Sequence, residues 1–367
     1  MSSAVKKIGV LTGGGDCPGL NAAIRAVAKT AIYEHGLEVI GIEDAFQGVV
    51  EHRMRPLGAR DVSGILTHGG TFLGSSASCD PGRMPSGTNS RGETIFEDIR
   101  EECASNLAKR GIDALVVIGG DGTMSVASGF VKLGVNCVGV PKTIDNDLVG
   151  SDVTIGFSTA VEVATEALDR LHTTAMSHHR VIVTEVMGRN AGWIALHAGV
   201  ASGSDVIVLP EIEYDLEAIC DFVRNRSQRG KRFSLICVSE GAKPKGGERT
   251  VKEIDSDAPD PIRLGGVGEK LADDIERETG IATRAVVLGH VLRGGTPNGC
   301  DRVLATMLGS RAVELIVGGS QGRLVVMQGG EVTDVDLLNS AHKQRLVEPD
   351  SELVQAARRV GTNFGDS

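Results

Sequence analysis

Short apolar runs alternate with longer segments of helical periodicity along most of the chain. The apolar runs have the character of buried strands and lie at Ile8–Thr12, Val39–Ile42, Ala114–Ile118, Cys137–Val140, Val181–Val186, Val206–Leu209, Ser234–Val238, Ala285–Leu288 and Leu324–Met327. Helices are predicted between them, for example at Ala22–Ile32, Thr94–Lys109 and Met124–Leu133. Strands separated by helices favour an α/β fold with mainly parallel sheets.

Two stretches break this alternation and are predicted to be loops. Gly74–Gly92 is rich in Ser, Gly and Pro, and Gly241–Pro261 is rich in Lys, Asp, Gly and Pro. In parallel α/β sheets, ligands bind beyond the carboxyl ends of the strands. The turns that follow the strands are therefore where functional side chains are expected.

The size of the chain and its composition indicate a globular protein. Its 367 residues exceed an average domain and are enough for two cores. No apolar run approaches the roughly 20 residues that cross a bilayer. The N-terminus, with Lys6 and Lys7 before a short apolar run, predicts a strand and not a signal peptide. We therefore expect a cytoplasmic protein that does not bind membranes.

Charge and cysteine content exclude several other classes. The net charge of -10 repels nucleic acid and anionic membranes, and the 3% of aromatic residues leaves few platforms for stacking bases. Any phosphate compound must therefore be bound by local Arg and Lys. The seven cysteines are dispersed and form no C-x-x-C pair, which suits a reducing compartment and gives no zinc framework.

The first apolar run is followed by a glycine turn, Thr12–Gly19, and then by a helix. Glycines let the backbone approach a phosphate closely, and the helix N-terminus behind them supplies free N–H groups. A plain tight turn would have the same composition. The spacing matches neither G-x-G-x-x-G nor G-x-x-x-x-G-K-[ST], so neither a Rossmann site nor a Walker site is indicated.

Two further turns carry carboxylates. In Gly119–Thr123, Asp121 stands between glycines after a strand, where it could hold Mg²⁺ while backbone N–H groups hold a polyphosphate. In Pro141–Asp147, Asp145 and Asp147 are two residues apart, so one could take a proton from a hydroxyl while the other orients it. A solvated acidic turn is the alternative for the second motif.

Together with motifs further along, these turns closely resemble the phosphofructokinase family. The motifs that carry the resemblance are Gly14–Asp16 with Pro18, Gly19, Asn21 and Ala22, then Gly119–Thr123, Thr143–Asp147, His179-Arg180, Met187–Arg189, Glu240, Thr283-Arg284, Gly289-His290 and Arg293–Gly295. They occur in the family's order and span almost the whole chain.

The resemblance implies a role for each matched residue. Asp145 would be the general base for the sugar 1-hydroxyl, acting with Thr143 and Arg189, and Asp121 would bind Mg²⁺. The donor phosphates would lie against Gly14, Gly120, Asp121, Gly122 and Thr123. The residues that would bind fructose 6-phosphate are Thr143, Asp145, Arg180, Met187, Gly188, Arg189, Glu240, Arg284, His290 and Arg293.

The resemblance also implies the architecture. Two three-layer α/β domains would enclose the active site in the cleft between them, with residues 1–156 and 291–345 binding the donor and residues 157–290 and 346–367 binding the sugar phosphate. In this family, the arginines at the positions of Arg180 and Arg284 reach the sugar phosphate of a neighbouring subunit. The protein would then be a homotetramer, or a homodimer, with shared active sites.

Two positions bear on the phosphoryl donor and disagree. Gly122 leaves room for the α-phosphate of ATP, where an Asp in pyrophosphate users would crowd it. Lys142 replaces the Gly of typical bacterial ATP users and could neutralise a pyrophosphate leaving group. Because a steric block is harder to evade than a missing charge, we expect ATP, with pyrophosphate as the alternative. Arg83 is a candidate for binding the nucleotide. Arg25 and Arg53 resemble effector-site arginines, although Lys29 stands where a further Arg is common in the family.

The expected activity is therefore phosphorylation of fructose 6-phosphate to fructose 1,6-bisphosphate, the committing step of glycolysis. Sedoheptulose 7-phosphate is a second possible acceptor. A kinase for a different acceptor would need only Gly119–Thr123, and a sugar-phosphate sensor would not need both Asp121 and Asp145. Both are therefore weaker alternatives.

Overall fold

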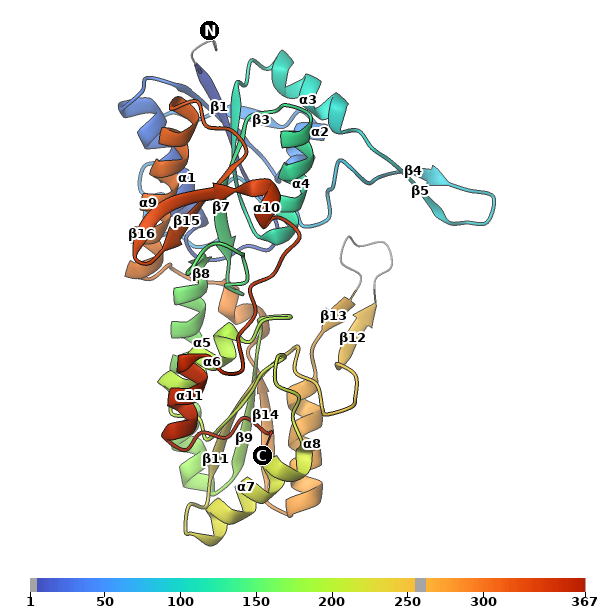
Figure 1. Ribbon diagram of the computed structural model, residues 1–367, viewed down its shortest axis with the longest axis vertical. Coiled ribbons are helices and arrows are strands. Elements are labelled where there is room, and N and C mark those ends of the chain that lie inside the picture. Colours follow the sequence, from blue (N-terminus) through green and yellow to red (C-terminus); the bar gives the residue numbers. More distant parts are fainter. Residues whose placement is uncertain (1–4, 255–261, 367) are drawn as a thin grey trace.

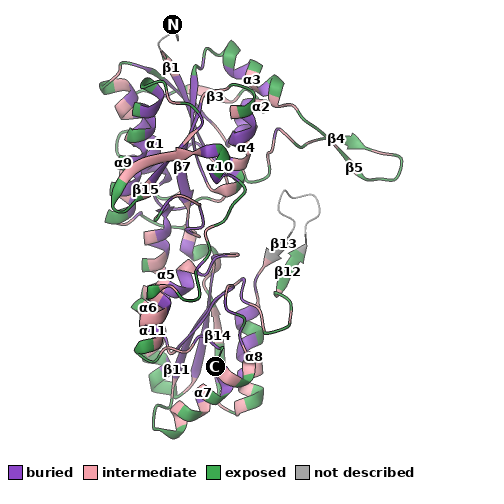
Figure 2. Ribbon diagram, in the orientation of Figure 1, coloured by how far each residue is buried: buried purple, intermediate pink, exposed green. Residues whose placement is uncertain are grey.

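The computed structural model describes residues 5–254 and 262–366. It consists of two lobes stacked along the long axis, each built around its own β-sheet (Figure 1). The apolar interior follows both sheets, as the buried positions in Figure 2 show. This architecture is the predicted α/β fold with mainly parallel sheets.

The first sheet has the order β16-β15-β7-β6-β1-β2-β3, with a short β8 on β7. Its strands are β1(Lys7–Thr12), β2(Glu38–Ile42), β3(Met54–Pro56), β6(Ala114–Gly119), β7(Cys137–Thr143), β8(Ile155–Gly156), β15(Arg323–Gln328) and β16(Glu331–Asp336). Only the outer strands β3 and β16 run antiparallel to their neighbours. The parallel interior therefore ends its strands at one common edge.

Helices cover both faces of this sheet. One apolar cluster includes α1(Leu20–Tyr33) and α9(Gly299–Val317), which pack against each other. The other cluster includes α2(Phe46–Val50), α3(Arg100–Lys109), α4(Asp121–Lys132) and α10(Leu337–Ser340). A short 3₁₀ helix, η1(Ile65–Thr67), lies beside α1.

The second sheet is entirely parallel, in the order β10-β11-β9-β14. Its strands are β9(Val181–Val186), β10(Val206–Val208), β11(Ser234–Ser239) and β14(Thr283–Val287). The helices α5(Phe157–His178) and α6(Trp193–Ala201) belong to the same apolar cluster as α1, while α7(Leu216–Gln228) and α8(Val267–Thr279) form a separate cluster with the sheet. The last helix, α11(Glu352–Arg359), joins the first of these clusters.

The chain crosses between the lobes at several points. It leaves the first sheet through β8 and α5 and returns through η2(Gly289–Arg293) and α9. The buried carboxylate of Asp301 ties these crossings together, because it accepts hydrogen bonds from the N–H groups of Gly156 (2.9 Å) and Thr159 (2.8 Å). The domain boundaries expected near residues 156, 290 and 345 stay predictions.

Two predictions from the pattern were partly wrong. The helix expected over Thr94–Lys109 begins only at Arg100, because Thr94–Glu97 forms β5, paired with β4(Met84–Thr88). Thr94, Ile95 and Phe96 are strand-favouring residues. The stretch expected to be a loop, Gly74–Gly92, therefore contains one strand of a hairpin, which projects from the first lobe (Figure 1).

The second expected loop, Gly241–Pro261, also contains a strand. β12(Val251–Ile254) pairs antiparallel with β13(Ile262–Leu264), and residues 255–261 of the loop lie outside the described residues. No helix in the described part of the chain has the length and apolar content needed to cross a bilayer.

Candidate active site

A cavity of about 750 Å³ lies where β1, β6 and β7 end at their carboxyl edge. It has the size of a small-molecule site. Sequence-predicted residues from five separate segments meet in its lining: Gly14, Gly120, Asp121, Gly122, Thr123, Lys142, Thr143, Asp145, Arg189 and Arg293. Except for Arg189 and Arg293, these residues follow or end strands of the first sheet.

The two glycine turns are packed around one buried side chain, Thr123. A Cβ on Gly13 would lie 2.7 Å from the Thr123 side chain, and one on Gly119 would lie 2.4 Å from it. Only glycine therefore lets both turns close on this threonine. Helix α4 starts directly behind the second turn, and no side chain caps its first N–H groups. These groups can bind an anion in the cavity.

Asp145 and Asp147 both line the cavity, on the turn after β7. Asn146, between them, has a positive φ of 54° and is held by its side-chain oxygen, which accepts from Thr154 N–H (3.0 Å). Burial raises the pKa of the Asp145 carboxyl, while the charges of Arg293, Arg189 and Lys142 lower it. Burial and the nearby charge of Asp145 also raise the pKa of Asp147. The two carboxyls are therefore electrostatically linked.

Two cations approach these carboxylates from the first sheet and from η2. The Lys142 side chain is almost fully buried, and its ammonium donates to the carbonyl of Gly15. Burial lowers the pKa of this ammonium. The Arg293 guanidinium occupies the space where a Cβ of Gly15 would be, and its Nε is buried without a hydrogen-bond partner in the described part of the chain. An arginine in this state is suited to an anionic ligand.

Arg189 reaches the cavity from the second lobe. It follows β9, has a positive φ of 53°, and its backbone N–H donates to the carboxylate of Glu240 after β11 (3.0 Å). Gly188 is required there, because a Cβ would lie 2.6 Å from the carbonyl of Ala191. Burial raises the pKa of Glu240 to about 7. The parallel pair β9 and β11 thus places Glu240 behind Arg189 rather than in the cavity lining.

A pH-dependent stability follows from Glu240. Its pKa rises from 4.5 to about 7 on folding, so the folded protein holds a proton between these pH values that the unfolded chain releases. Above pH 7 Glu240 is ionised in the folded protein as well. The free energy of unfolding is then lower than below pH 4.5 by about 3 kcal/mol. We expect Glu240→Gln to raise Tm relative to the original protein more at pH 8 than at pH 5, measured by thermal denaturation.

The exposed Glu331→Gln serves as the control for this measurement, since it removes a carboxylate without changing a buried group. Its Tm should stay close to that of the original protein at both pH values. If Glu240→Gln gains as much at pH 5 as at pH 8, the ionisation of Glu240 is not the cause.

Other predicted residues do not reach the cavity. Met187 packs against the apolar cluster to which α5 and α6 belong, and His290 is exposed on η2. Arg180 precedes β9 and Arg284 lies in β14, at the opposite end of the second sheet from Arg189. Arg284 pairs with Glu276 on α8 (3.0 Å). A single chain therefore does not bring these two arginines to Asp145.

Asp121 is the predicted magnesium ligand, at the first residue of α4. Its carboxylate accepts one hydrogen bond, from the N–H of His342 (3.0 Å), and burial raises its pKa. Among the residues that the structure describes, no three of His, Cys, Asp or Glu form a metal-binding cluster. Mg²⁺ commonly needs only one or two carboxylates besides substrate phosphates and water, so Asp121 fits a metal that arrives with a phosphate donor.

The cavity also contains residues that the sequence did not indicate. It extends along α4 past Ser125 and Gly129 to Lys132, and Arg100 from α3 lies against Gly129. Arg83, the candidate from the sequence, instead stacks over Phe96 in the hairpin (4.0 Å) and does not line the cavity. No short motif surrounds Arg100 or Lys132, so only the folded arrangement identifies them.

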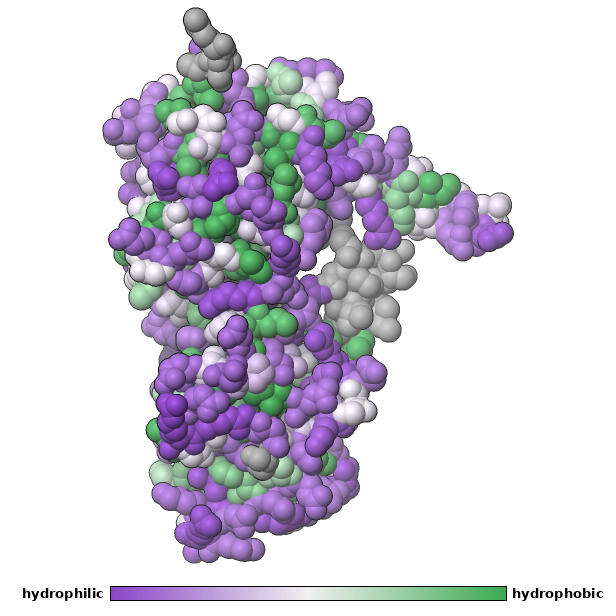
Figure 3. Space-filling view, in the orientation of Figure 1, coloured by the Kyte–Doolittle hydropathy of each residue, from purple (hydrophilic) through white to green (hydrophobic). Residues whose placement is uncertain are grey.

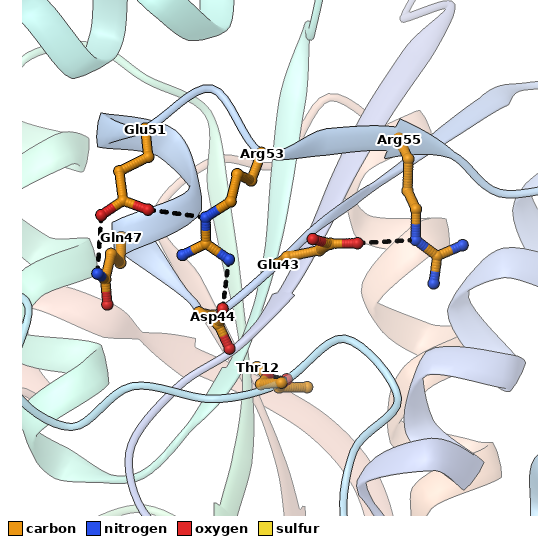
Figure 4. A network of polar contacts seen from close by, with 8 residues as sticks. Thr12, Glu43, Asp44, Gln47, Glu51, Arg53 and Arg55 are labelled. Carbon is orange, nitrogen blue, oxygen red and sulfur yellow. Dashed lines mark hydrogen bonds and ion pairs between the residues drawn. The ribbon is translucent and has the colours of Figure 1, made fainter.

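A polar network supports the cavity wall formed by Ala45 and Phe46 (Figure 4). Arg53 forms ion pairs with Asp44 and Glu51, so it is engaged within its own chain. Arg55 forms a similar pair with Glu43 (3.1 Å). These contacts hold the turn after β2, in which Ala45 has a positive φ of 58°.

Comparison with known proteins supports the resemblance to the phosphofructokinase family. The family model described as phosphofructokinase matches residues 7–316. The chain is 50% identical over 370 residues to ATP-dependent 6-phosphofructokinase 2 of Clostridium perfringens, covering 100% of both. It is 46% identical over 344 residues to pyrophosphate–fructose 6-phosphate 1-phosphotransferase of Amycolatopsis methanolica, covering 94% of this chain and 97% of that protein.

Solved structures agree as well. Phosphofructokinase of Pichia pastoris in its T-state matches with a TM-score of 0.78 and 32% identity, over 93% of this chain. This chain spans only 36% of the length of that yeast chain. On the sequence motifs, the fold and these matches, the chain belongs to the phosphofructokinase family.

Proposed function

We propose that this chain transfers the γ-phosphoryl group of ATP to the 1-hydroxyl of fructose 6-phosphate. The carrying observation is that the half-buried carboxylate of Asp145 shares one cavity with three cationic side chains, Arg189, Arg293 and Lys142, whose charges act on it. A carboxylate among cations suits removal of a hydroxyl proton beside phosphate groups. The two relatives named above support the same acceptor. One is named a 6-phosphofructokinase and the other a fructose 6-phosphate 1-phosphotransferase.

In the proposed reaction, Asp145 takes the proton of the 1-hydroxyl as its oxygen bonds to the γ-phosphorus, and the bond from phosphorus to the ADP oxygen breaks. Arg189 and Arg293 neutralise the transferring oxygens. The Thr143 oxygen already accepts from Asp145 N–H (3.1 Å), so its own O–H remains available for the phosphoryl group. Gly14, Gly120 and Thr123 would lie against the donor phosphates, and the N-terminus of α4 would face the same phosphates.

Mg²⁺ would be held by Asp121 together with the donor phosphates. Bound there, it would shield the negative charge that builds up between the β- and γ-phosphates. We also propose that Glu240 acts indirectly, by holding the backbone of Arg189, and that Met187 and Gly188 shape the same sugar-binding turn.

The shape of the cavity supports ATP as the donor. Gly122, Ser125, Gly129 and Lys132 line it from one side of α4, and ten residues of helix span about 15 Å. That length suits a nucleoside triphosphate and exceeds what pyrophosphate needs. A Cβ on Gly122 would meet no atom within 4 Å, so this position leaves open space in the cavity. Pyrophosphate remains the alternative donor because Lys142 also borders the site.

We further propose a homotetramer, or a homodimer, with shared active sites. Arg180 and Arg284 lie at the far end of their sheet from Asp145, so they could complete only another subunit's site. His290, exposed on η2, would then meet the sugar phosphate beside them. The protein would work in the cytoplasm, where its seven free cysteines stay reduced.

The test is formation of fructose 1,6-bisphosphate from fructose 6-phosphate and Mg²⁺, with ATP and pyrophosphate in parallel reactions. We expect turnover with ATP, loss of turnover on chelation of the metal, and at least about tenfold slower reaction with pyrophosphate. Faster turnover with pyrophosphate would refute the donor assignment alone. No product with either donor, from a folded protein, would contradict the acceptor as well.

A further inference from the structure

The chain after α10 connects the two lobes directly at the active site. Residues 342–347, here called the connecting segment, run from the first lobe toward α11 on the second (Figure 1). His342 and Gln344 of this segment line the cavity. No residue of the connecting segment belongs to the sequence motifs from which the function was predicted.

On the first lobe, the connecting segment contacts both acidic turns. The N–H of His342 donates to Asp121 (3.0 Å), and the N–H of Arg345 donates to the carbonyl of Asp147 (2.7 Å). The side chain of Gln344 reaches the Asp147 carboxylate itself, with Nε2 donating to Oδ2 (2.9 Å). The segment therefore borders the proposed metal ligand and the catalytic turn at once.

On the second lobe, the same segment contacts the turn that carries Arg189. The side-chain nitrogen of Asn190, the next residue, donates to Oε1 of Gln344 (2.9 Å). Trp193 Nε1 donates to the carbonyl of Arg345 (2.9 Å), and Val347 N–H donates to Glu211 (2.8 Å). The Gln344 amide thus bridges the two lobes through one acceptor and one donor contact.

Four side chains form a continuous series of hydrogen bonds, Arg249, Asn190, Gln344 and Asp147. The arginine and the carboxylate at its two ends determine how the amides of Asn190 and Gln344 are oriented. Arg249 can only donate, and it donates to the side-chain oxygen of Asn190 (2.6 Å). Asn190 must then present its nitrogen to Gln344, whose oxygen accepts. The Gln344 nitrogen is left to donate to Asp147, which as a carboxylate only accepts. Every donor in this series points from the arginine toward the carboxylate.

We propose that Gln344 is a positioning residue, which aligns the Asp145–Asp147 turn of one lobe with the Arg189 turn of the other. Arg189 reaches the cavity only from the second lobe, while Asp145 belongs to the first. Their relative placement therefore depends on contacts between lobes, and Gln344 makes one between the turns that carry them. This inference rests on the proposed kinase activity and adds a residue to it.

The experiment compares steady-state kinetics of Gln344→Leu, Asn190→Ala and the double variant with those of the original enzyme. A hydrogen bond to a charged group corresponds to a factor of about ten or more. We expect Gln344→Leu to lower kcat about tenfold while KM for ATP changes less than twofold. The loss of Asn190 alone should be similar, and the double variant should lose about tenfold, not a hundredfold.

Two further variants separate positioning from general stability. Gln344→Glu should lose more activity than Gln344→Leu at pH 8.5, since a like charge then faces Asp147. Relative to the original enzyme at the same pH, its loss should shrink as pH falls, because the new carboxyl can donate once protonated. Gln355→Leu, on α11, lies outside the cavity lining and should keep full activity. All variants should keep Tm within about 2 °C.

Several outcomes would contradict the positioning role of Gln344. A kcat for Gln344→Leu within twofold of the original would overturn it, as would losses that multiply in the double variant or a loss that follows a fall in Tm. A pH-independent effect of Gln344→Glu would also contradict it. An original enzyme without turnover would instead contradict the proposed function, so the two failures can be told apart.

Discussion

Asp145→Asn is expected to lower kcat by about 10²–10⁴-fold, the usual contribution of a general base. The amide has nearly the same shape but cannot take the proton of the sugar hydroxyl. Binding should change less, because Arg189 and Arg293 still line the cavity and remain available to the phosphates. Steady-state kinetics with fructose 6-phosphate, ATP and Mg²⁺ measure the loss, and thermal denaturation checks that the fold is retained.

The control is Asp273→Asn, which makes the same chemical change at an exposed position of α8. It should keep both kcat and Tm. If Asp145→Asn turns over within about tenfold of the original enzyme, the base is a different group. Asp147, on the same turn and electrostatically linked to Asp145, would then be the first alternative.

Gly122→Asp should change the preferred donor. The new side chain has room in the protein, since a Cβ there meets nothing within 4 Å, and it would project into the cavity that Gly122 lines. A carboxylate beside the ATP phosphates adds like-charge repulsion, which costs several kcal/mol. We expect kcat/KM for ATP to fall by about a hundredfold or more, while kcat/KM for pyrophosphate changes by less than about tenfold.

Gly122→Ala provides the matched control, because it adds bulk at the same position without charge. Its effect on ATP should be clearly smaller than that of Gly122→Asp. An equal fall for both donors in Gly122→Asp would show that the carboxylate disturbs phosphate binding in general. In that case Gly122 does not determine donor choice, and Lys142 becomes the more important of the two positions.

The sequence predicted the residues of the cavity lining best where those residues stand together in one turn after a strand. The turns at Gly119–Thr123 and Thr143–Asp147 follow strands, and their glycines and carboxylates stand together in the chain. The helix over Thr94–Lys109 was partly wrong because apolar spacing there fits a helix, whereas the pairing of β4 with β5 decides the structure of its first residues. Propensity alone does not reveal such pairing.

The residues that the sequence missed depend on contacts between distant parts of the chain. Gln344 lies about two hundred residues after the turn that it contacts, within a segment of no recognisable motif. Arg100 reaches the cavity only because Gly129 lets it lie against α4. The roles proposed for Arg180 and Arg284 would depend on another subunit, so neither their spacing nor one folded chain tests them.

The order of strands in the first sheet has a consequence for synthesis on the ribosome. β7 pairs with β15, yet β15 emerges roughly 180 residues later, or about ten to forty seconds at usual translation rates. All four strands of the second sheet are made within that interval. The nascent chain can therefore complete its second sheet first, while β7 stays an open edge that favours binding by chaperones or by other nascent chains.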